Sequence, residues 1–188
     1  MKKIAVFASG NGSNFQAILD QIQLGAVKAE IGLVVCDKPQ AGVVDRAKSA
    51  GIPVFCFVPK EFKTKDEFES EILAALQKHQ IDFVILAGYM RLIGSTLLGA
   101  YTNKIVNIHP SLLPAFPGKD AIGQAFHAGV KVTGVTVHFV DAGMDTGPII
   151  AQQAIEITNE DTALTIADKI HKVEHALYPK VIGELVSK

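Results

Sequence analysis

The sequence predicts an α/β fold: a doubly wound, mostly parallel, Rossmann-like sheet that ends in an antiparallel C-terminal strand pair. Two observations lead to this prediction. Short apolar runs alternate with amphipathic stretches of helical periodicity through the first part of the chain. These runs are apolar at nearly every position, which is typical of parallel strands buried on both faces of a sheet.

The elements of the parallel part follow in order along the chain. Strands are expected over residues 4–8, 31–36, 54–58, 83–86 and 105–108. Helices are expected over residues 15–23, 43–50 and 66–79. The third helix has four apolar residues at helical spacing on one face, namely Phe68, Ile72, Ala75 and Leu76.

The pattern changes after about Gly129. Residues 132–140 alternate between apolar and polar side chains, and residues 149–157 follow across a glycine-rich turn, which predicts the antiparallel pair. A last helix is expected from about residue 161 to 178, with Thr158 and Asp161 as a capping box and Pro179 as its end or a kink. Its expected buried stripe is Leu164, Ala167, Ile170, Val173 and Leu177.

The composition indicates a folded single-domain protein and argues against several classes of partner. With 188 residues, 48% of them hydrophobic, the chain can form one folded domain with a sizeable core. A formal net charge of -1 gives no basic field for nucleic acid or an anionic membrane. Residues 9–14 interrupt the apolar start too early for a secretory signal, and no apolar run is long enough to span a bilayer.

The two cysteines point to a reducing compartment. Cys36 and Cys56 both lie in apolar runs and lack metal-ligand spacing, so we expect buried thiols. Together with the composition, this predicts a cytoplasmic protein with no nucleic-acid or membrane partner.

A candidate catalytic group lies at the end of the predicted strand 105–108. Asn107 and His109 are two positions apart, so in a strand their side chains point the same way. Pro110 then ends the strand, and ligands of open α/β sheets bind outside the carboxyl ends of strands. The glycine-rich stretch 141–148 supplies Asp145 to orient the imidazole. An amide, an imidazole and a carboxylate together favour acid–base catalysis over a merely capped strand end.

The glycine loop, Ser9-Gly10-Asn11-Gly12-Ser13-Asn14, joins the first strand to the first helix. Glycines allow close approach of backbone N–H groups, and the helix start offers unpaired N–H groups, so the loop favours a single phosphate. A dinucleotide fingerprint remains an alternative, since Asp37 follows the second strand as a ribose-binding acid would. However, Phe15 stands where that fingerprint has its third glycine.

Four motifs occur in a recognisable order: the glycine loop, Ala-Gly-Tyr-Met-Arg over 87–91, Asn-Ile-His-Pro-Ser-Leu-Leu-Pro over 107–114, and Asp-Thr-Gly-Pro over 145–148. With these motifs the chain resembles the glycinamide ribonucleotide formyltransferase family over nearly its whole length. The third motif is shared across the wider formyltransferase superfamily. The glycine loop narrows the resemblance to enzymes with phosphoribosyl substrates.

The resemblance implies a folate-dependent enzyme of de novo purine biosynthesis. Its co-substrate would be 10-formyltetrahydrofolate, its acceptor the amine of 5-phosphoribosylglycinamide, and it would need no metal. The chain would be a single formyltransferase domain over 1–188, with a phosphate-binding half over about 1–100 and a catalytic and folate-cleft half over about 101–188. It would act on small molecules as a monomer or homodimer.

The resemblance also assigns residues. The catalytic group is Asn107, His109 and Asp145. The acceptor-binding residues are Asn11, Gly12, Ser13, Asn14 and Glu174. The folate-binding residues are Lys65, Met90, Arg91, Leu92, Ile93 and, again, Asn107. Residues 119–122 depart from the pattern, because some members have further histidines there, so the folate cleft can differ in detail.

Several alternatives remain open from the sequence. His138 is either a partner in the cleft or a structural histidine. His171 and His175 have i, i+4 spacing, but the H-E-x-x-H metal motif is absent. A formyltetrahydrofolate hydrolase usually has an extra N-terminal domain and a methionyl-tRNA formyltransferase a basic C-terminal one, and we expect neither here. A nicotinamide-dependent oxidoreductase and a non-catalytic nucleotide-binding module are the alternatives from other classes.

Overall fold

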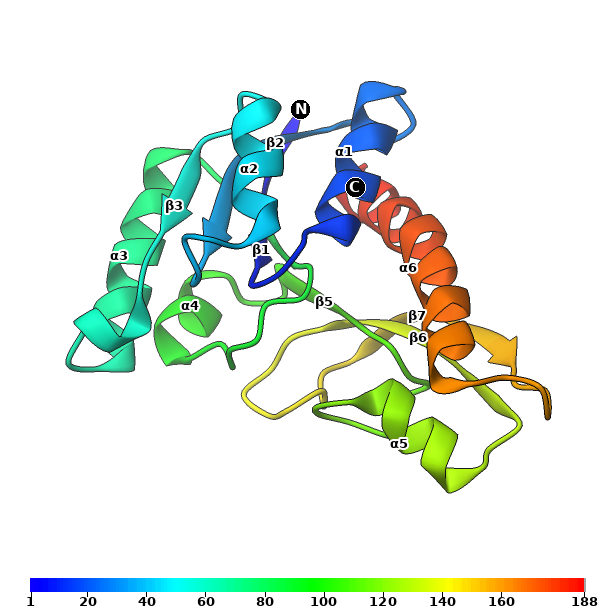
Figure 1. Cartoon of the computed structure of the whole chain (residues 1–188). Helices are drawn as coiled ribbons and strands as arrows, with labels where there is room; N and C mark the ends of the chain where they lie inside the picture. Colours follow the sequence, from blue (N-terminus) through cyan, green and yellow to red (C-terminus); the bar gives the residue numbers. More distant parts are fainter. Residues whose placement is uncertain (188) are drawn as a thin grey trace.

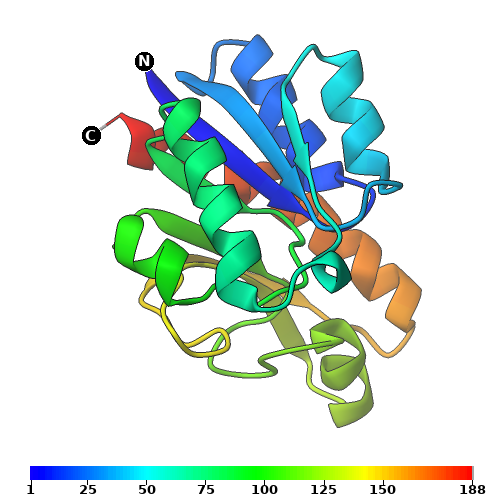
Figure 2. The same ribbon diagram turned by 90° about the vertical axis from the view of Figure 1, so that its left-hand side faces the viewer.

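A seven-stranded sheet with strand order β3-β2-β1-β4-β5-β6-β7 runs through the computed structural model, which describes residues 1–187 (Figures 1 and 2). The strands are β1 (Lys2–Ala8), β2 (Ala29–Cys36), β3 (Val54–Cys56), β4 (Phe83–Leu86), β5 (Ile105–His109), β6 (Val132–Phe139) and β7 (Ile149–Glu156). Strands β1 to β5 pair in parallel, whereas β5–β6 and β6–β7 are antiparallel. The predicted fold class is therefore confirmed.

Helices cover both faces of this sheet. They are α1 (Ser13–Gln23), α2 (Gly42–Ser49), α3 (Lys65–Lys78), α4 (Ser95–Ala100), α5 (Ala121–Ala128) and α6 (Ala163–Val186), with a short 3₁₀ turn at Pro59–Glu61. Side chains of β1 alternate between two cores, as strand geometry requires. Ile4 and Val6 pack with α1, α2 and α6, whereas Ala5 and Phe7 pack with α3 and α4. The sheet is thus buried on both sides.

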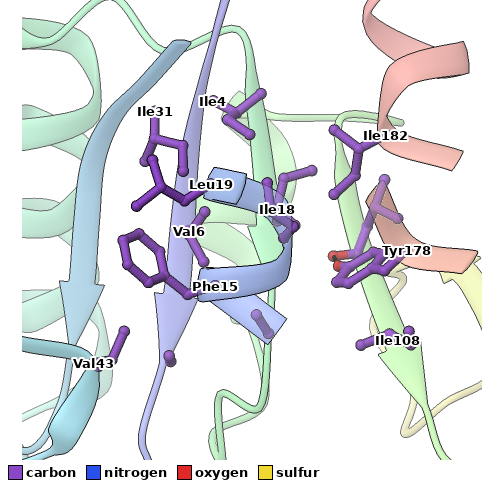
Figure 3. Packing of buried hydrophobic residues seen from close by; sticks show 14 of the residues in the cluster. Ile4, Val6, Phe15, Ile18, Leu19, Ile31, Val43, Ile108, Tyr178 and Ile182 are labelled. Carbon is purple, nitrogen blue, oxygen red and sulfur yellow. Dashed lines mark hydrogen bonds between the residues drawn. The ribbon is translucent and has the colours of Figure 1, made fainter. Parts of the chain in front are cut away.

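Tyr178 ties α6 to the middle of the sheet. It is fully buried, and its hydroxyl donates hydrogen bonds to the carbonyl oxygens of Leu86 (2.8 Å) and Val106 (3.1 Å). Figure 3 shows its ring between α6 and the strand that carries Ile108. Leu86 is the last residue of β4 and Val106 is the second residue of β5, so Tyr178 ties α6 to both strands.

The last helix differs from the prediction in three ways. Its N-cap is Thr162, which forms a capping box with Thr165, although Asp161 does bond to Thr158 as expected. It does not end at Pro179, which is buried within the helix. Of the predicted stripe, Ile170 is fully buried but Leu164 is 79% exposed. The buried face instead follows a spacing of four, through Ile166, Ile170, Glu174, Tyr178 and Ile182.

Other expectations need correction as well. Cys36 is buried, but Cys56 is exposed because it ends the three-residue edge strand β3. Helix α4 lies in a stretch where the sequence predicted no element. Over the described residues, no helix is both long and apolar enough to cross a membrane.

Candidate active site

A cavity of about 560 Å³ opens at the carboxyl ends of β1, β4 and β5. Its walls come from the glycine loop, the chain after β4, the end of β5, the loops after β5 and β6, and α6. The position is the one expected for a ligand in an open α/β sheet. The cavity therefore brings together parts of the chain that are far apart in sequence.

Asn107, His109 and Asp145 meet in this cavity, as predicted. Asn107 and His109 project from β5, and Asp145 comes from the loop after β6. Asp145 Oδ2 lies 3.4 Å from His109 Nδ1. His109 Nε2 lies 2.9 Å from the carbonyl oxygen of Phe116. Both ring nitrogens thus face oxygen acceptors, a geometry in which a doubly protonated imidazole donates to both.

His138 joins this group from the neighbouring strand. It pairs with Asn107 across the antiparallel β5–β6 ladder, and its Nε2 lies 3.3 Å from the Asn107 amide nitrogen. Its Nδ1 lies 2.8 Å from the carbonyl oxygen of Phe139. A neutral ring with its hydrogen on Nδ1 satisfies both contacts, donating to Phe139 and accepting from Asn107. His138 therefore faces the cleft and fixes the amide of Asn107.

The carboxylate of Asp145 is held from several sides. Oδ2 accepts a hydrogen bond from Gly118 N (2.8 Å), and Oδ1 lies 3.7 Å from His138 Nε2. Burial by itself raises the pKa of this carboxyl, but the Gly118 hydrogen bond and the positive charge of a protonated His109 outweigh it. The net effect lowers the pKa of Asp145 below its ordinary value, so the group is a carboxylate near neutral pH.

The glycine loop forms one end of the cavity. Gly12 caps α1 with φ 82°, a conformation that glycine adopts without strain, and a Cβ there would come within 2.8 Å of Val43. No side chain caps this helix start. Its first-turn N–H groups have no acceptor within the helix and lie where an anion is favoured. The predicted residues Asn11, Gly12, Ser13 and Asn14 all line the cavity.

Glu174 lies opposite the loop on α6. Asn14 Nδ2 donates to Glu174 Oε2 (3.4 Å), and Asn14 Oδ1 is buried without a hydrogen-bond partner within residues 1–187. Burial raises the pKa of Glu174, and the nearby His171 and the Asn14 hydrogen bond partly offset this. A buried acid and a half-satisfied amide thus face the cavity, where hydroxyl groups of a ligand would find partners.

The chain after β4, residues 89–94, forms another wall of the cavity, and we call it the β4 segment. Met90, Arg91, Leu92 and Ile93 all line the cavity. Met90 and Leu92 are exposed, which leaves apolar surface for a flat ligand. Arg91 Nε donates to Asp37 Oδ2 at 2.8 Å. Because Asp37 pairs with Arg91, it is not free to bind a ribose, which argues against the dinucleotide-binding alternative.

Lys65 is not among the residues that line the cavity. It begins α3, and its Nζ lies 3.9 Å from Glu69 Oε1. Its role as a folate contact stays a prediction. For a metal ion, the described part of the chain contains no cluster of three or more His, Cys, Asp or Glu side chains.

The sequence matches the formyl transferase family over residues 2–182. The chain belongs to this family. It is 61% identical over 186 residues to the phosphoribosylglycinamide formyltransferase of Bacillus subtilis (strain 168), a match that covers 99% of this chain and 95% of the relative. The resemblance read from the four motifs is thereby confirmed.

Solved structures agree with this membership. A phosphoribosylglycinamide formyltransferase from Bacillus halodurans superposes with a TM-score of 0.97 at 56% identity, covering 100% of this chain and 96% of the other. Glycinamide ribonucleotide transformylase 1 from Geobacillus kaustophilus gives a TM-score of 0.97 at 59% identity, covering 98% of each chain.

Two contacts of this formyl transferase were not predicted from the sequence. Arg46 on α2 donates to Asn11 Oδ1 (2.9 Å) and to its carbonyl oxygen (2.9 Å), which fixes the glycine loop. His138 was singled out, but its contact with Asn107 was not foreseen. The β-strand alternation of residues 132–140 could have indicated that contact, because it places His138 and Thr136 on one face.

Proposed function

We propose that this cavity transfers the formyl group of 10-formyltetrahydrofolate to the amine of 5-phosphoribosylglycinamide. The products are formylglycinamide ribonucleotide and tetrahydrofolate, in de novo purine biosynthesis. One observation carries the proposal: Asn107, His109 and Asp145 share a single cavity with the glycine loop and the β4 segment. The activity named for the Bacillus subtilis relative supports it.

The acceptor lies along the glycine loop. Its phosphate accepts hydrogen bonds from the first-turn N–H groups of α1 and from Ser13, where the helix dipole favours negative charge. Its ribose hydroxyls reach Glu174 and Asn14, which both line the cavity. This remote anchoring directs the amine toward His109 and provides binding energy for positioning.

The formyl donor lies against the β4 segment. The apolar side chains of Met90, Leu92 and Ile93 cover the folate ring, and Arg91 keeps guanidinium N–H groups for the anionic tail beyond its Nε contact with Asp37. N10 and its formyl carbon then lie beside Asn107 and His109.

Transfer proceeds through a tetrahedral intermediate. The acceptor nitrogen forms a bond to the formyl carbon, and the carbonyl oxygen becomes an oxyanion. The Asn107 amide and His109 donate hydrogen bonds to it, and one such donor contributes about 10²–10³ in turnover. The doubly protonated His109 supplies a proton to N10 as the C–N10 bond breaks, and the ring then takes up the extra proton of the acceptor nitrogen, so it ends as it began. No covalent enzyme intermediate is required.

Asp145 and His138 position these groups. Asp145 faces His109 Nδ1 and stabilises its positive charge, whereas His138 holds the side chain of Asn107. Both act close to the reacting atoms without forming bonds to substrate carbon.

A hydrolase is the second candidate, because water could replace the amine. The glycine loop argues against it, since a hydrolase has no use for a phosphate site in the same cavity. We further propose a single domain with the two halves described above, acting as a monomer or homodimer in the cytoplasm without a metal. The low net charge and unpaired cysteines support that part of the proposal.

The test is an assay of purified protein with 10-formyltetrahydrofolate, with and without phosphoribosylglycinamide. We expect loss of the formyl group that depends on the acceptor. Loss at the same rate without acceptor would indicate a hydrolase, and no loss under either condition would refute the transferase.

A further inference from the structure

Three buried polar side chains from three different parts of the fold hold the β4 segment. Ser9 follows β1, Asp37 follows β2, and Glu69 belongs to α3. Their exposed fractions are 4%, 5% and 1%, whereas Met90 in the segment is 67% exposed. The β4 segment therefore exposes one side to the cavity, while buried polar side chains contact its other side.

Ser9 holds the start of the segment. Its hydroxyl oxygen accepts a hydrogen bond from Met90 N (3.0 Å), and its own N–H donates to the carbonyl oxygen of Gly88 (3.0 Å). These bonds extend the β1–β4 ladder beyond the last strand residues. Since Ser9 is also the first residue of the glycine loop, it connects the glycine loop directly to the β4 segment.

Glu69 binds the end of the β4 segment, and Asp37 binds its middle. Glu69 Oε1 accepts a hydrogen bond from Gly94 N at 2.6 Å, and Asp37 Oδ2 accepts one from Arg91 Nε at 2.8 Å. The Arg91 guanidinium also lies 5.9 Å from the centre of the Phe68 ring. The segment is thus attached at its beginning, middle and end.

A contribution to folding stability does not by itself explain why Asp37 and Glu69 are buried. Asp37 Oδ1 and Glu69 Oε2 are buried, and neither has a hydrogen-bond partner in the described part of the chain. Burying a carboxylate is costly unless all its oxygens are satisfied, and apolar replacements are often more stable. Their hydrogen bonds instead fix the backbone conformation of the β4 segment.

We propose that Ser9, Asp37 and Glu69 are positioning residues for the formyl donor. They hold the β4 segment in the shape that receives the folate, and they touch no reacting atom. This inference rests on the proposed function. Because Ser9 belongs to the glycine loop as well, it positions both substrates, whereas Glu69 and Asp37 position the donor alone.

The experiment compares Ser9→Ala, Asp37→Leu, Glu69→Met and Glu69→Gln. It measures KM for each substrate, kcat, the Kd of tetrahydrofolate under anaerobic conditions, and Tm. We expect Glu69→Met and Asp37→Leu to raise the donor KM and the tetrahydrofolate Kd by roughly three- to tenfold, the effect of one lost hydrogen bond. Their kcat and acceptor KM stay at the wild-type values. Glu69→Gln keeps an oxygen for Gly94 N–H and restores the donor KM.

Ser9→Ala separates the shared role from the donor-only role. It should raise both KM values, and it folds because the amide of the exposed Met90 can bond to water instead. The matched control is Thr133→Val, which removes a buried β6 hydroxyl that has no partner among residues 1–187. Thr133→Val should change Tm but neither KM.

Two results would overturn the inference while leaving the function intact. One is a wild-type donor KM in both Ser9→Ala and Glu69→Met. The other is a donor KM that rises as much in Thr133→Val. If wild-type protein neither binds tetrahydrofolate nor formylates the acceptor, it is the proposed function that fails.

Discussion

Asp145 Oδ2 lies 3.4 Å from His109 Nδ1, so a loop that follows β6 places its carboxylate against an imidazole that ends β5. The other oxygen of Asp145 lies 3.7 Å from His138 Nε2. One carboxylate therefore meets two imidazoles from adjacent antiparallel strands. This arrangement depends on the β5–β6 pairing, which places His138 opposite Asn107.

His109→Asn should lower kcat by about 10²–10⁴, the usual contribution of a positioned acid–base group. Asn retains hydrogen-bonding capacity but cannot move a proton. Donor binding should persist, because the β4 segment is unaltered. Steady-state turnover and tetrahydrofolate titration measure the two effects, and near-normal turnover would refute the proton-transfer role.

Asp145→Asn should lower kcat by about 10²-fold or more and alter the pH–rate profile, because the amide no longer stabilises a charged His109. The pKa of Asp145 is depressed in the folded protein, so the carboxylate contributes stability above its unfolded pKa of about 3.9. That contribution is lost as the pH falls through the lower folded value. Denaturant unfolding between about pH 2 and 7 should therefore show a smaller acid loss of stability in Asp145→Asn than in the wild type. An unchanged pH–rate profile would remove Asp145 from the mechanism.

Glu174→Gln should stabilise the protein near pH 7 while weakening acceptor binding. Burial raises the folded pKa of Glu174, so its contribution favours the folded state below the unfolded pKa and is lost as the pH rises through the folded pKa. Gln removes this penalty and can donate to Asn14 Oδ1, which has no hydrogen-bond partner among residues 1–187. We expect a Tm increase of about 2–4 °C for each 1 kcal/mol gained. A lower Tm at pH 7 would contradict this account.

Gly12→Ala should impair both the fold and the acceptor site. A Cβ at this φ of 82° is strained by about 1–2 kcal/mol, and it meets Val43 at 2.8 Å. Gly51→Ala is the matched control, because Gly51 has φ 70° but nothing lies within 4 Å of the point that its Cβ would occupy. Gly12→Ala should lower Tm more than Gly51→Ala, and it alone should raise the acceptor KM. Equal effects of the two variants would argue against a tight loop at Gly12.

Ser13→Asp should weaken acceptor binding, because it places a negative charge beside the expected phosphate at the start of α1. We expect an increased acceptor KM and an unchanged donor KM. Ser13→Asn is the uncharged control of similar size. An acceptor KM that stays at the wild-type value in Ser13→Asp would count against the phosphate site.

Much of the fold could be predicted because its first parallel strands are continuous apolar runs. Residues 4–8 and 31–36 contain no charged or polar side chain apart from the thiol of Cys36. This pattern alone indicates strands that are buried on both faces of the sheet. Helix α4 was missed because it has only six residues and contains Gly99, which weakens the helical signal. Of the two expectations for Pro179, an end or a kink, the end is wrong, because packing of α6 against the sheet outweighs the local preference to stop.

The common orientation of Asn107 and His109 could be predicted from strand alternation, whereas the contacts around the cavity could not. Asn107 and His109 share a face by spacing alone. The ion pair of Arg91 with Asp37 joins the segments that follow β4 and β2. The hydrogen bonds of Arg46 with Asn11 join α2 to the glycine loop. Such contacts depend on the order of strands in the sheet, which hydrophobic periodicity does not encode.

The most direct test of formyl transfer follows a ¹³C-labelled formyl group from 10-formyltetrahydrofolate in the presence of phosphoribosylglycinamide. We predict that the label appears on the acceptor amine, with one tetrahydrofolate formed for each acceptor formylated. Recovery of the label as free formate, with the acceptor unchanged, would contradict direct transfer in this cavity.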